Sequence, residues 1–221
     1  MKKIKKTLSD PNGIVHATEQ MKFWQGRFGD AFIDRISGNF DEYSKKEYGI
    51  TRTSLNNKFL SKISKNARIL EVGCNFGRQL ELLKNSGFTN LWGIDINDKA
   101  LCIAKSNKEF HVVRGSALDI PFKDGFFDIV FTSYVLIHIH PKNLTQAIRE
   151  MYRVSNRYLW GAEFFSSKCE KLNYRGHKNK MWRNNFPKLF LEEYPDLTIV
   201  KEKRLPYLKD KNVDVMYLLR K

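Results

Sequence analysis

Cysteine is scarce in this chain of 221 residues, and its three cysteines form no recognisable set. Cys74, Cys102 and Cys169 are odd in number, lie far apart and lack the paired spacing of metal ligands. Reduced thiols fit this usage better than a disulfide framework does. We therefore expect a cytoplasmic protein and predict no metal site.

Long uncharged apolar runs are also absent. No segment approaches the roughly 18 apolar residues that a membrane span needs, and the basic N-terminus lacks the apolar core of a secretory signal. There is no internal repeat and no low-complexity segment. With 42% hydrophobic and 13% aromatic residues, the chain has the composition of a folded domain and not of a disordered one.

Acidic residues are few beside basic ones, 24 against 39, which gives a formal net charge of +15. This excess predicts attraction to an anionic partner such as an acidic metabolite, a sugar nucleotide, nucleic acid or a membrane surface. Basic residues gather in the first six positions and, interleaved with aromatics, between residues 168 and 188. A lysine-rich surface without a specific partner is the alternative interpretation.

Three regions are expected along the chain. Residues 1–17 resemble a flexible basic arm, residues 18–64 an N-terminal helical cap, and residues 65–221 an α/β core. In the cap, Thr18 begins a capping pattern, Trp24, Phe28 and Phe32 follow with helical spacing, and a second helix is predicted over 54–63.

The core alternates strand and helix patterns. Strands are predicted over 68–72, 91–95, 110–113, 127–133 and 158–165, with helices after the first two and over 142–154. Two last strands, over 197–203 and 213–220, have no convincing helix between them. The pattern predicts a mostly parallel seven-stranded sheet, with helices on both faces and a C-terminal antiparallel hairpin.

The turn after the first predicted strand suits close approach of a ligand. It runs from Glu71 through Gly73 to Gly77, where Gly73 permits a positive φ and Gly77 lets the next helix pack on the strand. No third glycine follows at the spacing of a dinucleotide fingerprint. By itself this turn is weak support for a site, because glycine turns after strands are common.

Two further features fall at the same edge of the predicted sheet. Asp95 ends the second strand, where a carboxylate is placed to accept hydrogen bonds from ribose hydroxyls. The small residues Ser116 and Ala117 follow the third strand and leave room for a flat adenine. Three such features at matching topological positions point to one nucleotide-like ligand.

This combination resembles the class I S-adenosylmethionine-dependent methyltransferases, which have a Rossmann-like fold. The segment from Glu71 to Gly77 is similar to their first motif and Asp95 to their ribose-binding acid, whereas Asn75 stands where many members have glycine. The resemblance implies S-adenosylmethionine as cofactor and S-adenosylhomocysteine as product. The predicted cofactor-binding residues are Trp24, Glu71, Gly73, Cys74, Asn75, Gly77, Asp95, Ile96, Ser116, Ala117, Leu118 and Thr132.

The chain also resembles a narrower group, the methylases associated with pseudaminic acid biosynthesis. The similarity is carried by residues 18–30, 135–139, 152–158 and 174–180, although Arg27 stands where an acidic residue is expected. It implies a small acidic sugar acceptor, of the nonulosonic acid type or its nucleotide-activated form, in glycan biosynthesis.

Two histidines are predicted as catalytic residues. Methyl transfer needs an aligned acceptor and often a base, and His138 follows the fourth strand at the edge where the acceptor belongs. His177 is the second candidate base, in a basic segment that includes Arg175, a residue type suited to carboxylates and phosphates. The predicted acceptor-binding residues are Tyr134, His138, Tyr174, Arg175 and His177. A helix-start histidine and a solvated basic loop are the alternatives.

Three other functions stay open. Basic residues interleaved with aromatics also suit an RNA methyltransferase, although Thr132-Ser133-Tyr134-Val135 replaces the motif typical of amino-group methylation of bases. Another small-molecule O- or N-methyltransferase is possible on the same pattern. A binding protein that keeps the fold without turnover is the third alternative. The oligomeric state cannot be predicted from the sequence.

Overall fold

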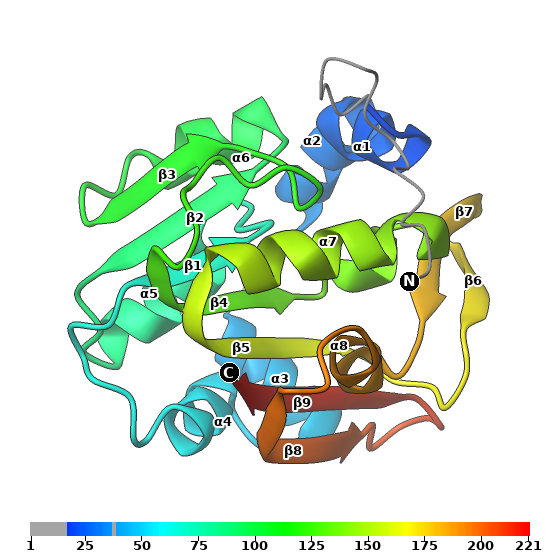
Figure 1. The fold of residues 1–221 in the computed structure, drawn as a ribbon. Coiled ribbons are helices and arrows are strands. Elements are labelled where there is room, and N and C mark those ends of the chain that lie inside the picture. Colours follow the sequence, from blue (N-terminus) through cyan, green and yellow to red (C-terminus); the bar gives the residue numbers. More distant parts are fainter. Residues whose placement is uncertain (1–16, 37–38) are drawn as a thin grey trace, which may run out of the picture.

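The computed structural model describes residues 17–36 and 39–221. The expected basic arm at 1–17 therefore lies, except for Ala17, outside the described residues. None of the described helices is long and apolar enough to span a membrane. Figure 1 shows the arrangement of the elements around one large central sheet.

The central sheet has seven strands in the order β3-β2-β1-β4-β5-β9-β8. The first five are parallel, and β9 pairs antiparallel with both β5 and β8 (Figure 1). This confirms the predicted mostly parallel sheet and its antiparallel C-terminal hairpin. The strands span Phe110–Arg114 (β3), Leu91–Asp95 (β2), Ile69–Val72 (β1), Phe127–Ser133 (β4), Ser155–Phe164 (β5), Val213–Arg220 (β9) and Thr198–Pro206 (β8).

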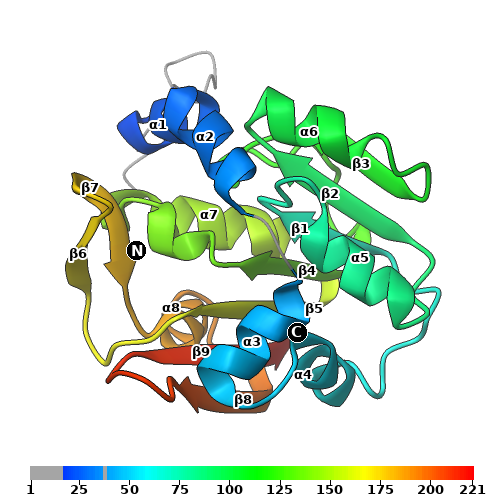
Figure 2. The ribbon, with the colours of Figure 1, turned by 180° about the vertical axis from the view of Figure 1, so that it is seen from behind.

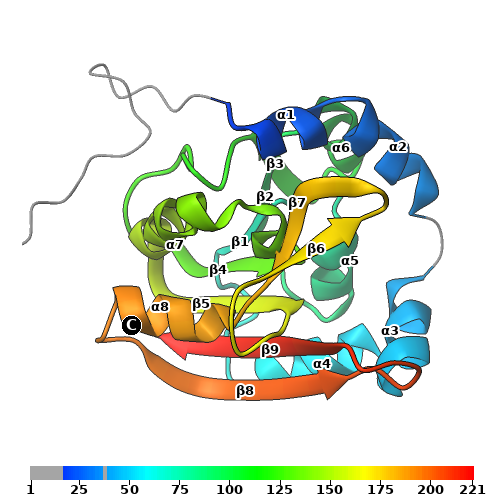
Figure 3. The ribbon, with the colours of Figure 1, turned by 90° about the vertical axis from the view of Figure 1, so that its right-hand side faces the viewer.

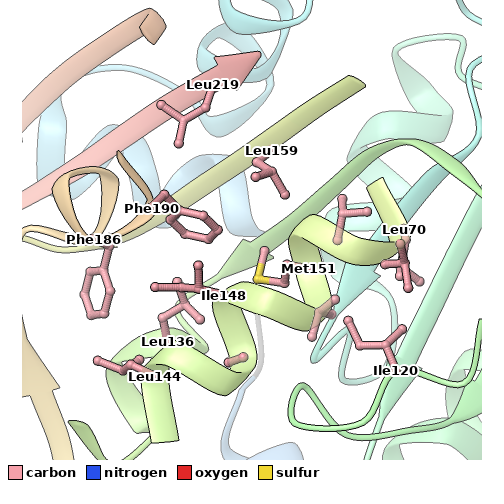
Figure 4. Packing of buried hydrophobic residues seen from close by; sticks show 14 of the residues in the cluster. Leu70, Ile120, Leu136, Leu144, Ile148, Met151, Leu159, Phe186, Phe190 and Leu219 are labelled. Atoms are coloured by element: carbon pink, nitrogen blue, oxygen red, sulfur yellow. The ribbon is translucent and has the colours of Figure 1, made fainter. Parts of the chain in front are cut away.

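Helices cover both faces of this sheet because its central strands are apolar on both sides. Side chains of α7 (Pro141–Val154) and α8 (Phe186–Glu193) share a buried cluster with one face. Those of α4 (Arg52–Phe59), α5 (Arg78–Asn85) and α6 (Asp98–Ala104) share another with the opposite face (Figures 1 and 2). Figure 4 shows Ile148 and Met151 of α7 and Phe190 of α8 gathered near Leu159 of β5.

The N-terminal helices divide into two pairs. Thr18 caps α1 (Glu19–Gln25) as predicted, its side chain accepting a hydrogen bond from the Met21 amide, and Gly26 separates α1 from α2 (Arg27–Arg35). These two helices lie beside α6 and β7 (His177–Arg183), whereas α3 (Phe40–Tyr48) and α4 lie near β8 and β9 (Figure 3). The helix expected over 54–63 begins earlier, because Thr51 caps its N-terminus, and it ends at Phe59.

A second, two-stranded sheet rises from the edge of the first (Figure 3). Its strands β6 (Glu170–Tyr174) and β7 (His177–Arg183) form an antiparallel hairpin in a segment for which we predicted no strand. The turn uses Arg175 and Gly176, with φ values of 50° and 85°, as in the tight turns whose twist suits a hairpin. The basic loop considered as an alternative is therefore an ordered hairpin.

Candidate active site

One cavity of about 540 Å³ opens at the carboxyl ends of β1, β2 and β4. This is the edge where ligands bind in open α/β sheets, and the volume falls in the usual range for small-ligand sites. The strand ends and the turns that follow them form its floor, and side chains of α1, α2 and the β6–β7 hairpin line its other walls. Figure 3 shows these covering elements together above the strand ends.

The turn after β1 brings the backbone close to its neighbours at Gly73. Its φ is 75°, and a Cβ built there would lie 2.5 Å from Cγ2 of Val135, so no larger residue fits without movement. The Gly73 amide donates to the carbonyl of Ile94 at 2.8 Å, which ties the turn to β2. Asn75 adopts a φ of 50° in the same turn. Glycine is thus required at position 73 by both conformation and space.

Asp95 ties two turns of the floor together. Its Oδ2 accepts a hydrogen bond from the Asn75 amide at 2.7 Å, and its Oδ1 accepts one from the Asn97 amide at 2.8 Å. Burial raises the pKa of the Asp95 carboxyl, and these backbone hydrogen bonds oppose the rise. Each carboxylate oxygen has two lone pairs, so the carboxylate keeps acceptor capacity toward the cavity that it lines.

Glu71 is the second acid of the floor, at the end of β1. It is buried, lines the cavity, and its Oε2 has no hydrogen-bond partner among the described residues. Burial raises the pKa of this carboxyl well above its usual range, although the charge of Arg52 lowers it. An unpartnered buried acceptor is costly unless a donor completes it. Glu71 therefore fits a ligand that carries a hydrogen-bond donor, above all a cationic one.

Small residues form a third part of the wall, after β3. Ser116, Ala117 and Leu118 all line the cavity, and the Leu118 amide donates to Oγ of Ser116 at 3.1 Å. Met21 of α1 lies over this segment, with its sulfur 3.8 Å from the Ser116 hydroxyl. Small side chains and the Met21 side chain therefore line this part of the cavity.

Most of the predicted cofactor residues line this one cavity. They are Trp24, Glu71, Gly73, Cys74, Asn75, Asp95, Ile96, Ser116, Ala117 and Leu118. Gly77 does not line it: with a φ of 89° it caps α5, and a Cβ there would meet the Phe110 ring at 3.1 Å. Thr132 is buried within β4. Gly77 and Thr132 therefore face packed neighbours and not the cavity, and their predicted contact with the cofactor stays a prediction.

His138 lies at the end of η1, a 3-10 helix at Leu136–His138, and lines the cavity. Its Nδ1 is 2.7 Å from the carbonyl oxygen of Lys180, and because a carbonyl only accepts, Nδ1 carries the hydrogen. Burial lowers the pKa of His138 to about 4, so at neutral pH the ring is uncharged. Its Nε2 therefore holds a free lone pair, the form that a general base needs.

His177 lies elsewhere. It is exposed at the start of β7 and is not among the residues that line the cavity. Its ring packs against Phe23 and Phe28, with centroid distances of 4.9 and 5.1 Å. His177 therefore packs on aromatic side chains of α1 and α2 and does not line the cavity with His138, and its role as a second base stays a prediction.

The neighbouring hairpin residues do reach the cavity. Tyr174 and Arg175 line it, and the Tyr174 ring lies 4.9 Å from the ring of His138. Trp24 of α1 lies 4.6 Å from His138 on another side. The imidazole is thus enclosed by aromatic rings from two covering elements.

Arginines that the sequence did not single out enter from other elements. Arg35 of α2 and Arg78 of α5 line the cavity together with Arg175. Arg35 and Arg175 thus lie on the covering elements, opposite the acidic floor of Glu71 and Asp95. Helical spacing alone does not identify which basic residues of α2 face inward, so no local signal marks Arg35.

Tyr134 closes the site at the end of β4, with a φ of 58°. Its hydroxyl donates to Oδ2 of the buried Asp214 at 2.5 Å. Hydroxyls of Tyr48 and Tyr207 donate to the same oxygen, at 2.5 and 3.4 Å. Burial raises the pKa of Asp214 to about 6 against these hydrogen bonds. The cluster fixes Tyr134 between α3 and the C-terminal hairpin.

No group of three or more histidine, cysteine or acidic side chains placed to hold a metal occurs in residues 17–36 and 39–221.

Residues 70–157 match a family model described as a methyltransferase domain. The chain is 33% identical over 98 residues to an uncharacterized protein of Haemophilus influenzae, covering 41% of this chain and 39% of that protein. It is 27% identical over 162 residues to a putative methyltransferase of Encephalitozoon cuniculi, covering 70% and 68%. A human mitochondrial tRNA N(3)-cytidine methyltransferase is 34% identical over 87 residues, covering 34% and 30%. The match thus spans about two fifths of the length of the Haemophilus influenzae protein and about two thirds of the length of the Encephalitozoon cuniculi protein.

Solved structures share the fold at low identity. A Pyrococcus horikoshii protein superposes with a TM-score of 0.60 at 16% identity, covering 92% of this chain and 94% of that one. A Burkholderia thailandensis 1,6-didemethyltoxoflavin-N1-methyltransferase with bound S-adenosylhomocysteine superposes with a TM-score of 0.61 at 16% identity, covering 76% of each chain. These likenesses confirm the Rossmann-like methyltransferase fold. Residues 70–157, which match the methyltransferase domain model, lie within this fold.

Proposed function

We propose that this protein transfers a methyl group from S-adenosylmethionine to a small acidic acceptor, with a nonulosonic acid or its nucleotide-activated form as the acceptor class, in glycan biosynthesis. The observation that carries the proposal is the make-up of a single cavity. Glu71 and Asp95 form its acidic floor, the uncharged His138 has a free Nε2 at its side, and Arg35 and Arg175 line it from the covering elements.

The floor residues suit the cofactor. Asp95 offers carboxylate oxygens to ribose hydroxyls, Glu71 offers an unpartnered oxygen to a cationic amino group, and Ser116 with Ala117 leaves a slot for adenine. Gly73 lets the backbone approach the ligand closely. When bound, S-adenosylmethionine supplies an electrophilic methyl group on a sulfonium.

His138 is the proposed base. Its Nε2 takes the proton that an acceptor hydroxyl or protonated amine loses. The hydrogen bond from Nδ1–H to the backbone carbonyl oxygen of Lys180 stabilises the resulting imidazolium. Trp24 and Tyr174, whose rings pack on the imidazole, hold its orientation.

The arginines supply affinity for an anionic acceptor. Arg175 lies beside Tyr174 in the hairpin turn, and its guanidinium matches a carboxylate or a phosphate in two parallel hydrogen bonds. Arg35 on α2 adds a second positive charge to the same enclosure. With these cations, we expect acidic acceptors to be preferred over neutral ones of equal size.

A second candidate is methylation of RNA. The net charge of +15 and the 34% identity over 87 residues to a tRNA methyltransferase favour it. A base that left its stack to enter the covered cavity would meet the same His138. The two candidates differ in the acceptor that is turned over.

The test is formation of S-adenosylhomocysteine, read by mass spectrometry, with free and nucleotide-activated nonulosonic acids, neutral nucleotide sugars and bulk RNA. Turnover of an acidic sugar, with a product heavier by one methyl group, supports the proposal. Arg175→Met is then expected to raise the acceptor KM roughly tenfold to a hundredfold, since a charged hydrogen bond contributes about 1.5–3 kcal/mol. The matched control Arg157→Met, at the far end of β5, is expected to change nothing. Activity on RNA alone overturns the proposal.

A further inference from the structure

Glu163 of β5 is a fully buried carboxyl that contacts the backbone just before His138. Its Oε1 accepts hydrogen bonds from the Val135 and Leu136 amides, both at 3.2 Å, and its Oε2 accepts one from the Ile137 amide at 3.4 Å. These three successive amides begin η1, where a helix leaves its first N–H groups without partners. One side chain therefore satisfies the whole start of this helix.

This carboxyl has no cationic partner. In the described part of the chain no lysine, arginine or histidine forms an ion pair with Glu163. A carboxylate buried in an apolar core is costly, and here backbone N–H dipoles compensate its charge. An amide or alcohol side chain has a single acceptor oxygen and would leave at least one of the three amides without a partner. Both carboxylate oxygens are therefore used to hold the backbone of residues 135–137.

The segment that Glu163 holds reaches both halves of the cavity. Val135 packs on Gly73 of the cofactor turn so closely that a Cβ there would lie 2.5 Å from its Cγ2. His138 and Tyr134 flank the three capped amides and line the acceptor side. A shift of this backbone would move the proposed base relative to the methyl donor.

We propose that Glu163 is a positioning residue of the active site, setting His138 through the backbone of residues 135–137. This rests on the proposed function, in which His138 is the base. Glu163 itself does not line the cavity.

The positioning is sensitive to pH. Burial raises the pKa of Glu163 to about 7, against the backbone amides and the Thr132 hydroxyl of β4. The titratable group that faces it from β9 is Tyr217. Burial raises the pKa of Tyr217 well above its usual value, so this group stays neutral across the same pH window. Ionised Glu163 accepts from all three amides, whereas the protonated form is a weaker acceptor. His138 is therefore held most firmly above about pH 7 and more loosely below it.

Histidine ring NMR of the full chain, without any acceptor, tests this directly. The His138 signals are assigned by their loss in His138→Gln and followed from pH 5.5 to 8.5. Because the pKa of His138 is about 4, its own titration lies outside this range. We expect its signals to shift with a midpoint near pH 7 in the wild type and to stay constant in Glu163→Gln. Signals that are flat in the wild type, or that shift equally in both proteins, refute the positioning role.

Activity gives the second readout. Glu163→Gln is expected to lower kcat about tenfold to a hundredfold, since small misplacements have effects of this order, while the Kd for S-adenosylmethionine is unchanged. The control is Asp128→Asn at the opposite end of β4. It removes another carboxylate that accepts a hydrogen bond from a backbone amide, that of Arg68. It is expected to leave kcat unchanged. If no acceptor is turned over, the proposed function fails, and the NMR titration still decides whether Glu163 sets His138.

Discussion

Replacing Asp95 by Asn is the most informative single change to the cofactor half of the cavity. The carboxylate accepts backbone hydrogen bonds from Asn75 and Asn97 at 2.7 and 2.8 Å and faces the cavity with its remaining lone pairs. The amide of an asparagine presents one oxygen and one NH2 group, so it accepts from only one of the two backbone amides. The charge toward the ribose is lost as well.

The expected loss follows from the hydrogen bonds involved. A hydrogen bond to a charged group contributes about 1.5–3 kcal/mol, which corresponds to a Kd for S-adenosylmethionine raised about tenfold to 150-fold. The amide left unpaired costs about 1–3 kcal/mol of folding free energy. Asp95→Asn should therefore weaken binding strongly and lower Tm, yet remain folded.

Isothermal titration calorimetry with S-adenosylmethionine and S-adenosylhomocysteine measures this change. Asp98→Asn is the matched control, since Asp98 lies three residues later, is exposed, and pairs with Arg114 at 2.7 Å on the surface. Its binding should equal that of the wild type. If Asp95→Asn binds as tightly as the wild type while folded, the assignment of Asp95 to the cofactor is refuted.

Three further predictions concern the same cavity and its support. His138→Gln should lower kcat by about 10²–10⁴, the usual contribution of a positioned base, without changing the calorimetric Kd for S-adenosylmethionine; an unchanged kcat would remove His138 from the chemistry. Gly73→Ala should destabilise the fold by about 1–3 kcal/mol and weaken cofactor binding, because φ is 75° and the new methyl group meets Val135 at 2.5 Å. An unchanged free energy of unfolding in urea together with an unchanged calorimetric Kd for S-adenosylmethionine would contradict this. Burial raises the pKa of Asp214 to about 6, so its contribution to stability is present below the usual pKa of about 3.8 and is lost as pH rises through 6. Wild-type stability should fall by up to about 1.4 kcal/mol per pH unit across that window from this group, and Asp214→Asn should lack the fall when urea unfolding is compared at pH 4 and pH 7; parallel pH profiles of the two proteins would contradict it.

The sheet, and the set of residues that meet at the carboxyl ends of its strands, could be predicted because their signals are local. Each strand of the core is a short apolar run, and Gly73 and Asp95 directly follow such runs. The carboxyl ends of parallel strands share one edge, so topology alone brings those residues together. That reasoning holds for any ligand of this shape, and S-adenosylmethionine itself comes only from the resemblance of the motifs.

The acceptor half depends on contacts between distant segments, which a single sequence does not encode visibly. The β6–β7 hairpin is rich in lysine and asparagine and lacks apolar alternation, so residues 170–183 gave no strand pattern. Its tight turn decides that Arg175 enters the cavity and His177 does not. The capping of residues 135–137 by Glu163 spans 26 to 28 positions and has no spacing signature.

The measurement that tests the central claim most directly is methyl transfer itself in a competition. The full chain is incubated with S-adenosylmethionine carrying a 13C-labelled methyl group, an acidic nonulosonic sugar and bulk RNA in one tube, and both acceptors are analysed by mass spectrometry. The account predicts label in the acidic sugar, with S-adenosylhomocysteine in equal amount, and loss of that label in His138→Gln. Label found only in RNA, or in neither acceptor while the cofactor binds, would contradict it.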